Sequence, residues 1–366
     1  MYKHIIFHIP MHLNRARTSA SGIRPFKLIA AFKNLGYKVD VVEGYGKERK
    51  KQISEIKKKI NSGIHYDFLY SESSTMPTLL TEKNHFPKYP CLDFSFFAFC
   101  KRAGIPIGLF YRDIYWCFAN RNKDWKQSIA KYFYRYDLRQ YEKFVDVLFL
   151  PTMEMFKHIP FNFDRQVVEL PSGCDLYTVS GKKDDRFISL LYIGGIGGDY
   201  NLIPFMEAVS KMPELHLTLC CRKNDWDKVK GEYGKFENAQ NITMVHKKGD
   251  ELKLLYEQAD VFALLYSSSV HYLQFAAPFK LFEAIGYGIP LLGYRENWSG
   301  KFIEKQGIGM ACDNTIEDLS RCLHSLCKNK ALLLDYRNRV SEIAPQHTWE
   351  NRCRQIAETL TKKNSK

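Results

Sequence analysis

Lys280 and Glu283 stand three residues apart in the segment 278–290, and they combine two residue types that bind nucleotides. On a helix, this spacing puts both side chains on one face within the first turn. A lysine there adds a full charge to the helix dipole and suits a diphosphate, whereas a carboxylate one turn later can accept hydrogen bonds from both ribose hydroxyls. The alternative is a simple ion pair on a solvated surface, which is the usual meaning of such a spacing taken alone.

A glycine-rich stretch follows the apolar run 188–193, which we expect to be a buried strand. Its glycines are Gly194, Gly195, Gly197 and Gly198. Glycine lets the backbone approach a phosphate closely, and a helix predicted near 200–211 would supply N–H groups and a positive dipole at its N-terminus. The alternative is a tight turn that binds no ligand.

A basic residue stands where a dinucleotide-binding fingerprint would place an acidic one. That fingerprint needs an acidic residue about 20 residues beyond the glycines, at the end of the next strand. Here the predicted strand 215–220 is followed by Cys221-Arg222-Lys223, which argues against NAD and makes Arg222 a second phosphate contact. His246, after the predicted strand 241–245, is assigned to the same nucleotide site. For Arg222, the alternative is a solvated strand end.

Asp113 is the candidate catalytic base in the first half of the chain. It follows the predicted strand 106–110, so it should lie at the carboxyl edge of the sheet, where sites of α/β proteins form. Its aromatic neighbours could stack on a ring of a ligand. The alternative is that Asp113 pairs with Arg112 or caps the following turn. His8 and His12, on the loop after the first strand, are lesser candidates.

Apolar runs alternate with amphipathic stretches throughout, a rhythm typical of βα units and a mostly parallel sheet. The predicted strands are 4–9, 38–43, 67–70, 106–110 and 146–150, then 188–193, 215–220, 241–245, 260–265, 290–293 and 308–311. The predicted helices are 22–35, 48–61, 92–103 and 122–144, then 200–211, 224–236, 250–258, 279–286, 315–327, 330–342 and 349–362.

The chain is too long for one hydrophobic core, because single cores rarely grow beyond about 250–300 residues and this chain has 366. A cluster of Pro, Ser, Gly and Asp near 171–175 predicts the domain boundary. We therefore expect two α/β domains joined by a linker. The predicted divisions are a first domain at 1–170, a linker at 171–186, a second domain at 187–348 and a C-terminal helix at 349–366.

No apolar stretch approaches the roughly 20 residues that a membrane helix needs, so we expect a cytoplasmic protein. The ten cysteines are scattered without a paired framework, which agrees with that expectation. Cys322, His324 and Cys327 would not converge on a metal from one helix, because positions two apart point to different sides. We therefore predict no metal site and no cofactor.

The positive charge is concentrated in the first half of the chain. Residues 1–170 hold 28 Lys and Arg against 16 Asp and Glu, a net +12, whereas residues 171–366 hold 26 against 24, a net +2. Such a field usually indicates an anionic partner. Lys131, Arg135, Arg139 and Lys143 recur every four residues among aromatic residues, which predicts a helix lying on an anionic membrane surface. The alternative is a solvated basic helix whose aromatic residues pack inward.

Taken in order, the motifs resemble those of GT-B glycosyltransferases, especially the bacterial family-4-like, or group 1, type. The resemblance runs through Ser21-Gly22-Ile23-Arg24, the segment 170–175, Ile193-Gly194-Gly195, the segment 278–290 and the terminal helix beginning at Trp349. It spans nearly the whole chain. There are two departures. Phe275 stands where the family often has a glutamate, and the glycine-rich loop replaces a frequent arginine and lysine.

The resemblance implies two Rossmann-like domains facing across a cleft. It implies transfer of a sugar from a nucleoside-diphosphate sugar to a hydroxyl of a glycan or lipid-linked acceptor, with UDP the commonest nucleotide in the group and GDP next. Glu283 would bind the ribose and Lys280 the diphosphate, while Ser21, Gly22 and Arg24 would belong to a donor or acceptor loop. Such enzymes generally need no metal. A non-catalytic binding subunit and a sugar-nucleotide epimerase of the same fold are the rival readings.

Overall fold

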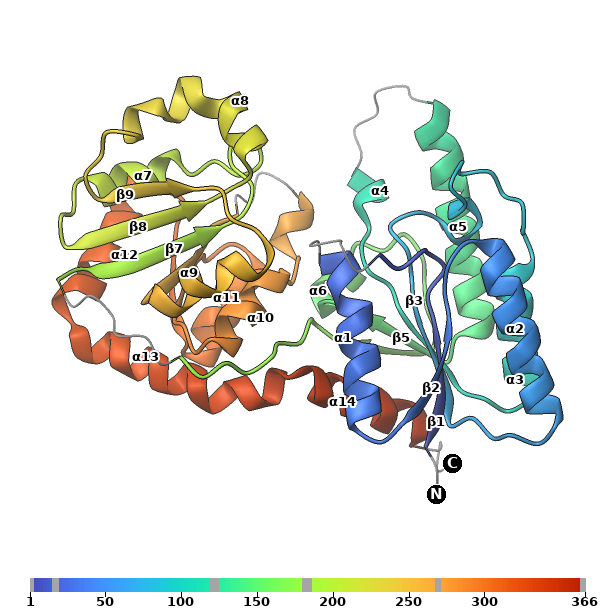
Figure 1. The fold of residues 1–366 in the computed structure, drawn as a ribbon. Coiled ribbons are helices and arrows are strands. Elements are labelled where there is room, and N and C mark those ends of the chain that lie inside the picture. Colours follow the sequence, from blue (N-terminus) through green and yellow to red (C-terminus); the bar gives the residue numbers. More distant parts are fainter. Residues whose placement is uncertain (1–2, 15–19, 119–124, 180–185, 267–270, 363–366) are drawn as a thin grey trace. The chain divides into compact units, whose positions relative to one another are not determined.

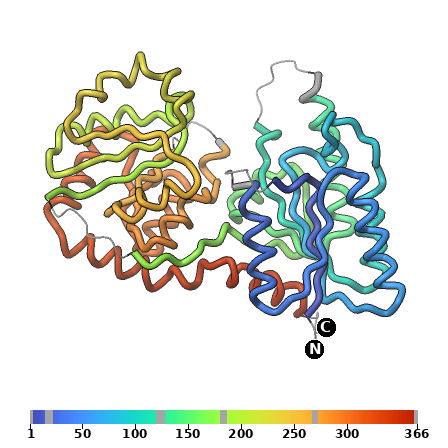
Figure 2. The backbone as a smooth tube through the Cα atoms, viewed as in Figure 1, coloured from blue at the N-terminus to red at the C-terminus, as the bar shows by residue number. Residues whose placement is uncertain are grey.

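The computed structural model describes residues 3–14, 20–118, 125–179, 186–266 and 271–362, and the chain divides into two compact units (Figure 1). The first unit combines residues 1–171 with residues 349–366, and the second comprises residues 172–348. Figure 2 traces this order from blue to red, and the last helix ends beside the beginning of the first strand.

The first unit is built on a six-stranded parallel sheet with the strand order β2-β1-β3-β4-β5-β6. Its strands are β1 (His4–His8), β2 (Lys38–Val42), β3 (Phe68–Glu72), β4 (Ile107–Phe110), β5 (Val147–Leu150) and β6 (Gln166–Glu169). The chain runs from β1 outward to β2 and returns to β3 on the other side of β1. The order therefore reverses between β1 and β3, which is where ligands bind at the carboxyl edge of such sheets.

Helices cover both faces of this sheet (Figure 1). One face carries α1 (Ala20–Asn34) and α14 (Trp349–Thr361), joined where the Cys353 thiol lies 3.5 Å from the Leu28 carbonyl oxygen. The other face carries α2 (Gly46–Asn61), α3 (Leu92–Arg102) and α5 (Trp125–Phe144). Two short helices, α4 (Tyr115–Phe118) and α6 (Met153–Phe156), complete the described helices of this unit. Gly36 ends α1 in the left-handed region at φ 82°.

The second unit repeats this plan with the strand order β12-β11-β10-β7-β8-β9, again all parallel. Its strands are β7 (Ile188–Ile193), β8 (Leu215–Cys220), β9 (Ile242–Val245), β10 (Val261–Leu264), β11 (Leu291–Tyr294) and β12 (Gly309–Cys312). The order reverses between β7 and β10. The carboxyl ends of these two strands therefore mark the expected ligand position in this unit.

Two hydrophobic cores sandwich the second sheet. One packs α7 (Ile203–Ser210), α8 (Lys223–Tyr233) and α12 (Ile316–Lys328) against the sheet. The other contains residues of α9 (Leu252–Gln258), α10 (Phe279–Gly286), α11 (Trp298–Gln306) and α13 (Lys330–Ile343). Both cores consist of aliphatic and aromatic side chains with little or no exposure. The sheet is thus apolar on both faces, as parallel sheets usually are.

The structure departs from the sequence prediction at several elements. Strand β6 and helices α4, α6 and α11 were not predicted, and the helix expected near 200–211 begins only at Ile203. The segment 172–179, predicted as a linker, is part of the second unit. There the Cys174 amide donates to the His347 carbonyl over 2.9 Å, and the Tyr177 amide donates to the Gly286 carbonyl over 3.0 Å. Residues 180–185 of the predicted linker lie outside the described residues.

Candidate functional site

Helix α10 presents the predicted nucleotide-binding pair. Lys280 is its second residue and Glu283 its fifth, and the Lys280 Nζ atom lies 2.7 Å from Glu283 Oε2. The side chains are 26% and 25% exposed, so the pair is neither buried nor fully solvated. The residues form the i,i+3 ion pair that the sequence left as an alternative. A bound nucleotide would either contact both side chains while they stay paired or break the contact between them.

A second partner also reaches the Glu283 carboxylate. The Tyr256 hydroxyl, from α9, donates to the same Oε2 atom over 3.2 Å. Among the described residues, no hydrogen bond or ion pair engages Glu283 Oε1. The carboxylate thus keeps one oxygen available, and a carboxylate oxygen can accept two hydrogen bonds.

The glycine-rich stretch forms a compact turn rather than a direct entry into a helix. The amides of Gly197 and Tyr200 each donate to the other residue's carbonyl over 3.0 Å, and α7 starts three residues later. The Gly194 amide donates to the Cys220 carbonyl at the end of β8 over 3.1 Å. The helix predicted near 200–211 is present as α7, and this reciprocal turn separates its start from the glycines.

Packing inside the turn explains three of its glycines. A Cβ atom at Gly194 would lie 2.7 Å from the Tyr192 hydroxyl, and one at Gly195 would lie 2.8 Å from the Tyr200 ring. At Gly197, it would lie 2.3 Å from a methyl group of Val229. Only Gly198, at φ 55°, has open space around that position. Internal contacts alone thus require most of these glycines, and their role in phosphate binding stays a prediction.

Arg222 and His246 lie at the carboxyl edge of the same sheet, after β8 and β9. Arg222 is exposed at the N-cap position of α8, where its carbonyl accepts hydrogen bonds from the Asp225 and Trp226 amides. His246 is also exposed, and its Nδ1 atom lies 3.0 Å from the Cys221 carbonyl oxygen. This edge therefore gathers the residues predicted for the nucleotide, with Arg222 reaching solvent and His246 held against the backbone.

Asp113 follows β4 at the carboxyl edge of the first sheet. Burial raises the pKa of its carboxyl group to about 6, although the Arg112 charge and a hydrogen bond from the Tyr115 amide oppose this shift. The Arg112 guanidinium makes its close ion pair with Glu72, at 2.9 Å, rather than with Asp113. Asp113 thus caps the following turn, as one alternative proposed, and has a pKa suited to general base catalysis near neutral pH.

Glu72, which sequence reasoning missed, is a fully buried carboxylate between two arginines. Arg24 Nε lies 2.8 Å from its Oε1 atom and Arg112 Nη2 lies 2.9 Å from its Oε2 atom. The Arg24 guanidinium also donates to the Pro171 carbonyl and packs on the Phe110 ring, 3.9 Å from its centroid. These partners lie 40 to 48 residues from Glu72 along the chain, so no local sequence pattern indicates them.

Ser21, Gly22 and Arg24, which were assigned to a donor or acceptor loop, are helical in the structure. All three residues belong to the beginning of α1, which starts at Ala20. The helix carries Arg24 into the interior, where it is 2% exposed, and this burial leaves its guanidinium facing Glu72. The Ser21 side chain and residues 15–19 lie outside the described part of the structure.

The two candidate histidines have different surroundings. His8 is buried, with Nδ1 2.8 Å from the Ser71 hydroxyl oxygen and Nε2 2.9 Å from Asp93 Oδ1. Arg49 holds the same Asp93 carboxylate through two hydrogen bonds of 2.9 and 3.0 Å. Burial alone would raise the pKa of Asp93, but His8 and Arg49 hold it below its ordinary value. Both ring nitrogens of His8 are therefore engaged in the scaffold, whereas His12 stacks on Tyr45.

Helix α5 exposes part of the predicted basic stripe. Arg135, Arg139 and Lys143 are exposed, and Lys131 is half-buried. Tyr132 is the outward-facing aromatic residue, 67% exposed. Other aromatic residues of the helix pack inward: Tyr134 stacks on Trp116, Tyr136 contacts Phe94, and Tyr141 is buried. The inward packing of these aromatic residues agrees with the alternative of a solvated basic helix, and binding of the exposed face to a membrane stays a prediction.

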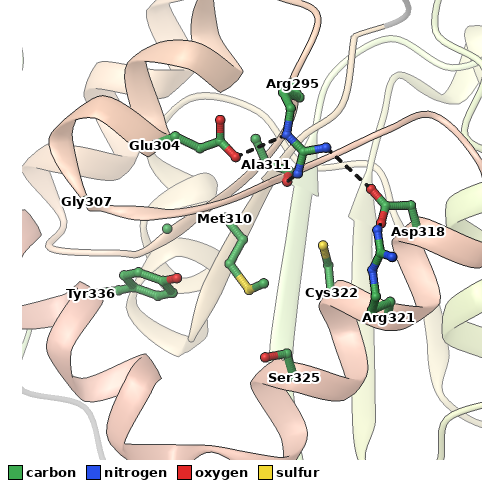
Figure 3. Close-up of a pocket in the computed structure, with 11 residues that line it drawn as sticks. Arg295, Glu304, Gly307, Met310, Ala311, Asp318, Arg321, Cys322, Ser325 and Tyr336 are labelled. Atoms are coloured by element: carbon green, nitrogen blue, oxygen red, sulfur yellow. Dashed lines mark hydrogen bonds and ion pairs between the residues drawn. The ribbon is translucent and has the colours of Figure 1, made fainter.

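A pocket of about 500 Å³ lies beside the edge strand β12, lined also by α11, α12 and α13 (Figure 3). Its charged side chains neutralise one another. Arg295 lies between Glu304 and Asp318, at 3.3 and 3.8 Å, and Arg321 pairs with the same Asp318. None of the predicted site residues lines this pocket. It therefore adds nothing to the nucleotide site.

The described residues contain neither a metal-binding cluster nor a helix that could span a membrane. Within the ranges given above, no three or more His, Cys, Asp and Glu side chains gather in a way that could hold a metal ion. Likewise, none of the helices in those ranges has the length and apolar character to cross a bilayer.

Comparison with known proteins identifies the second unit. Residues 177–347 match the family model of the glycosyl transferases group 1. The second unit is therefore similar to this family, and the chain as a whole has the GT-B fold. No curated protein matches the chain in sequence.

Solved structures share the fold over nearly the whole chain. A glycosyltransferase from Rickettsia africae is 13% identical with a TM-score of 0.63, and the match covers 100% of both chains. Anabaena Alr3699/HepE in complex with UDP is 10% identical with a TM-score of 0.62, covering 98% of this chain and 99% of that one. WaaG, a glycosyltransferase involved in lipopolysaccharide biosynthesis, is 14% identical with a TM-score of 0.61, covering 98% and 100%.

Proposed function

We propose that this protein transfers a sugar from a nucleoside-diphosphate sugar, with UDP as the nucleotide, to a hydroxyl group of a glycan or lipid-linked acceptor. The pathway we propose is the synthesis of a bacterial cell-surface polysaccharide or glycan, on the cytoplasmic side of the membrane. The nucleotide sugar is a co-substrate, and the reaction uses neither a metal nor another cofactor.

The observation that carries this proposal is the one-quarter-exposed Lys280–Glu283 pair on α10. Lys280 turns from Glu283 to the diphosphate and neutralises the charge that develops on the leaving group. Glu283 then accepts hydrogen bonds from the ribose hydroxyls. Among the similar structures, Alr3699/HepE is in complex with UDP in one case and with UDP-glucose in another, which supports the choice of nucleotide.

Asp113 supplies the base on the acceptor side. Its carboxylate takes the proton from the acceptor hydroxyl while that oxygen forms the new bond to the sugar carbon and the bond to the nucleoside diphosphate breaks. The half-buried setting and the pKa of about 6 support this role. If the reaction retains the configuration of the sugar, Asp113 orients the acceptor instead.

A thermal-shift panel of UDP, GDP, CMP and TDP tests the nucleotide assignment. Free nucleotide at one hundred times its Kd should add about 2.7 kcal/mol of apparent stability. UDP should give the largest shift, with and without excess EDTA. A protein that none of the four stabilises would contradict the proposal, and a shift that requires Mg²⁺ or Mn²⁺ would contradict metal independence.

Product analysis separates the rival functions. Release of UDP from a UDP-sugar together with a glycosylated acceptor supports the transferase. Interconversion of sugar nucleotides without an acceptor would indicate an epimerase, and UDP binding without turnover would indicate a non-catalytic subunit.

The exposed face of α5 supports an acceptor held at an anionic membrane. Arg135, Arg139 and Lys143 would each contribute about 1 kcal/mol near such a surface. Sedimentation with anionic and neutral vesicles tests this part of the proposal. Wild type should bind only the anionic vesicles and detach with salt, whereas Arg135→Glu with Arg139→Glu should not bind. Equal binding of both vesicle types would indicate a soluble acceptor.

A further inference from the structure

Tyr256 occupies a position that no sequence motif indicated. It lies on α9, is 2% exposed, and comes within hydrogen-bond distance of Glu283, 27 residues further along the chain. Its hydroxyl and the Lys280 ammonium group both contact Glu283 Oε2, at 3.2 and 2.7 Å. Two internal donors therefore converge on one carboxylate oxygen, and the other oxygen is left for an external donor.

A column of parallel aromatic rings holds Tyr256 in place. Its ring stacks on Tyr287 at 4.6 Å and 4° and on Phe262 at 5.6 Å and 14°. Tyr287 in turn stacks on Tyr177 at 3.9 Å and 7°. Burial, with the nearby Glu283 carboxylate, raises the pKa of Tyr256 well above its ordinary value. The hydroxyl therefore keeps its proton and remains a donor.

The two donors behave differently when a nucleotide binds. Lys280 is a flexible side chain, one-quarter exposed, and its ammonium group also lies 5.7 Å from the centroid of the Tyr256 ring. It can turn to a diphosphate, which removes the 2.7 Å contact from Glu283. The stacked ring of Tyr256 cannot follow. Its hydroxyl then remains the internal donor that orients the Glu283 carboxylate.

We propose that Tyr256 is a positioning residue that holds Glu283 Oε2, so that Oε1 faces the ribose hydroxyls of the nucleotide. This inference rests on the proposed function, because it assigns a partner to the ribose-binding carboxylate. It makes the preference for ribose over deoxyribose a property of the Tyr256–Glu283 pair rather than of Glu283 alone.

The test compares the affinities for UDP and 2′-deoxy-UDP by calorimetry. A hydrogen bond to a charged group changes an equilibrium constant by about one order of magnitude. Wild type should therefore bind UDP about tenfold more tightly than 2′-deoxy-UDP. Tyr256→Phe keeps the stacked ring but removes the hydroxyl, so this ratio should fall to below about threefold. Tyr177→Phe removes a hydroxyl from the same column that does not contact Glu283, and it should keep the wild-type ratio.

A double variant guards against a general loss of structure. If both residues act through one contact, Tyr256→Phe should not lower the ratio further in a Glu283→Gln background. A Tyr256→Phe protein that binds both nucleotides more weakly but keeps the tenfold ratio would overturn the proposal and leave Tyr256 a packing residue. Wild type that binds UDP without discriminating ribose would overturn it as well. Wild type that binds no nucleotide would instead reject the proposed function itself, and this inference with it.

Discussion

Each of the two units has a glutamate paired with basic residues, but the two glutamates differ in burial and in how many of their oxygens are engaged. In the first unit, Glu72 is fully buried, and two arginines engage its two oxygens. In the second unit, Glu283 is one-quarter exposed, and its internal partners share one oxygen. A carboxylate with both oxygens engaged in the interior holds the scaffold together, whereas one with an oxygen that no described residue engages, near solvent, can take a ligand. A carboxylate at the end of a strand or helix therefore indicates a binding site only if one of its oxygens is free to accept a hydrogen bond from a ligand.

Substitution of Glu72 is the strongest test of the scaffold side of this comparison. Glu72→Gln leaves two buried arginine charges without their counterion, so the free energy of unfolding should fall by about 3–5 kcal/mol. Urea denaturation measures this loss. Glu154→Gln is the matched control in the same unit, because Glu154 forms an exposed ion pair with Lys157 and should cost less than about 1 kcal/mol. A Glu72 variant no less stable than this control would show that the buried pairs are not structural.

Asp113 tests whether the first edge also contributes to chemistry. Asp113→Asn should lower kcat by about 10²-fold and leave the affinity for UDP unchanged, as expected for loss of a general base. The base acts when deprotonated. Since its pKa is raised to about 6, kcat/KM of wild type should fall about tenfold per pH unit below pH 6 and level off above it.

Initial rates of UDP release between pH 5 and 8 check this profile. The residual activity of the Asp113→Asn variant should lack the decline below pH 6. If the Asp113→Asn variant keeps wild-type turnover, Asp113 has no catalytic role. The same conclusion follows if the rate of neither protein changes with pH.

Local patterns predicted most of the fold because helices and buried strands repeat with short periods. Strand β6 escaped prediction because its four residues are exposed or only half-buried, so they show no apolar run. The Lys280–Glu283 pair was visible because both residues lie on one helix. By contrast, the two arginine partners of Glu72 lie 40 and 48 residues away and the Glu283 partner of Tyr256 lies 27 residues away, so only the folded chain brings them together.

The Glu283 variant tests the ligand-binding side of the comparison. Glu283→Ala should weaken UDP binding by about 1.5–3 kcal/mol, the range for a lost hydrogen bond to a charged group, and change stability by less than about 1 kcal/mol. Calorimetry and urea denaturation separate the two effects. Glu304→Ala removes a half-exposed partner of Arg295 in the same unit and should leave the affinity unchanged. Wild-type affinity in the Glu283 variant would reject the assignment.

Asp137 of α5 shows what a free acceptor does where no ligand can reach it. Its Oδ2 atom accepts a hydrogen bond from the Thr78 amide over 2.7 Å, and its Oδ1 atom is buried without a hydrogen-bond partner among the described residues. Burial, assisted by the charge of Asp93, raises the pKa of Asp137 from 3.8 to about 7. Here the unpaired carboxylate oxygen lowers the stability of the folded state and does not form a binding site.

The effect of Asp137 on stability should depend on pH. Because the folded state holds its proton up to a higher pH than the unfolded state, wild type loses stability as the pH rises from about 4 through 7. Asp137→Asn keeps an acceptor for the Thr78 amide and carries no charge. At pH 8 it should therefore be more stable than wild type by about 1–2 kcal/mol, the order of a buried unpaired polar group, and at pH 4 the advantage should vanish. The melting temperatures of wild type and Asp137→Asn between pH 4 and 8 test this prediction. A difference in melting temperature that does not change with pH would mean that Asp137 is not buried in its charged form.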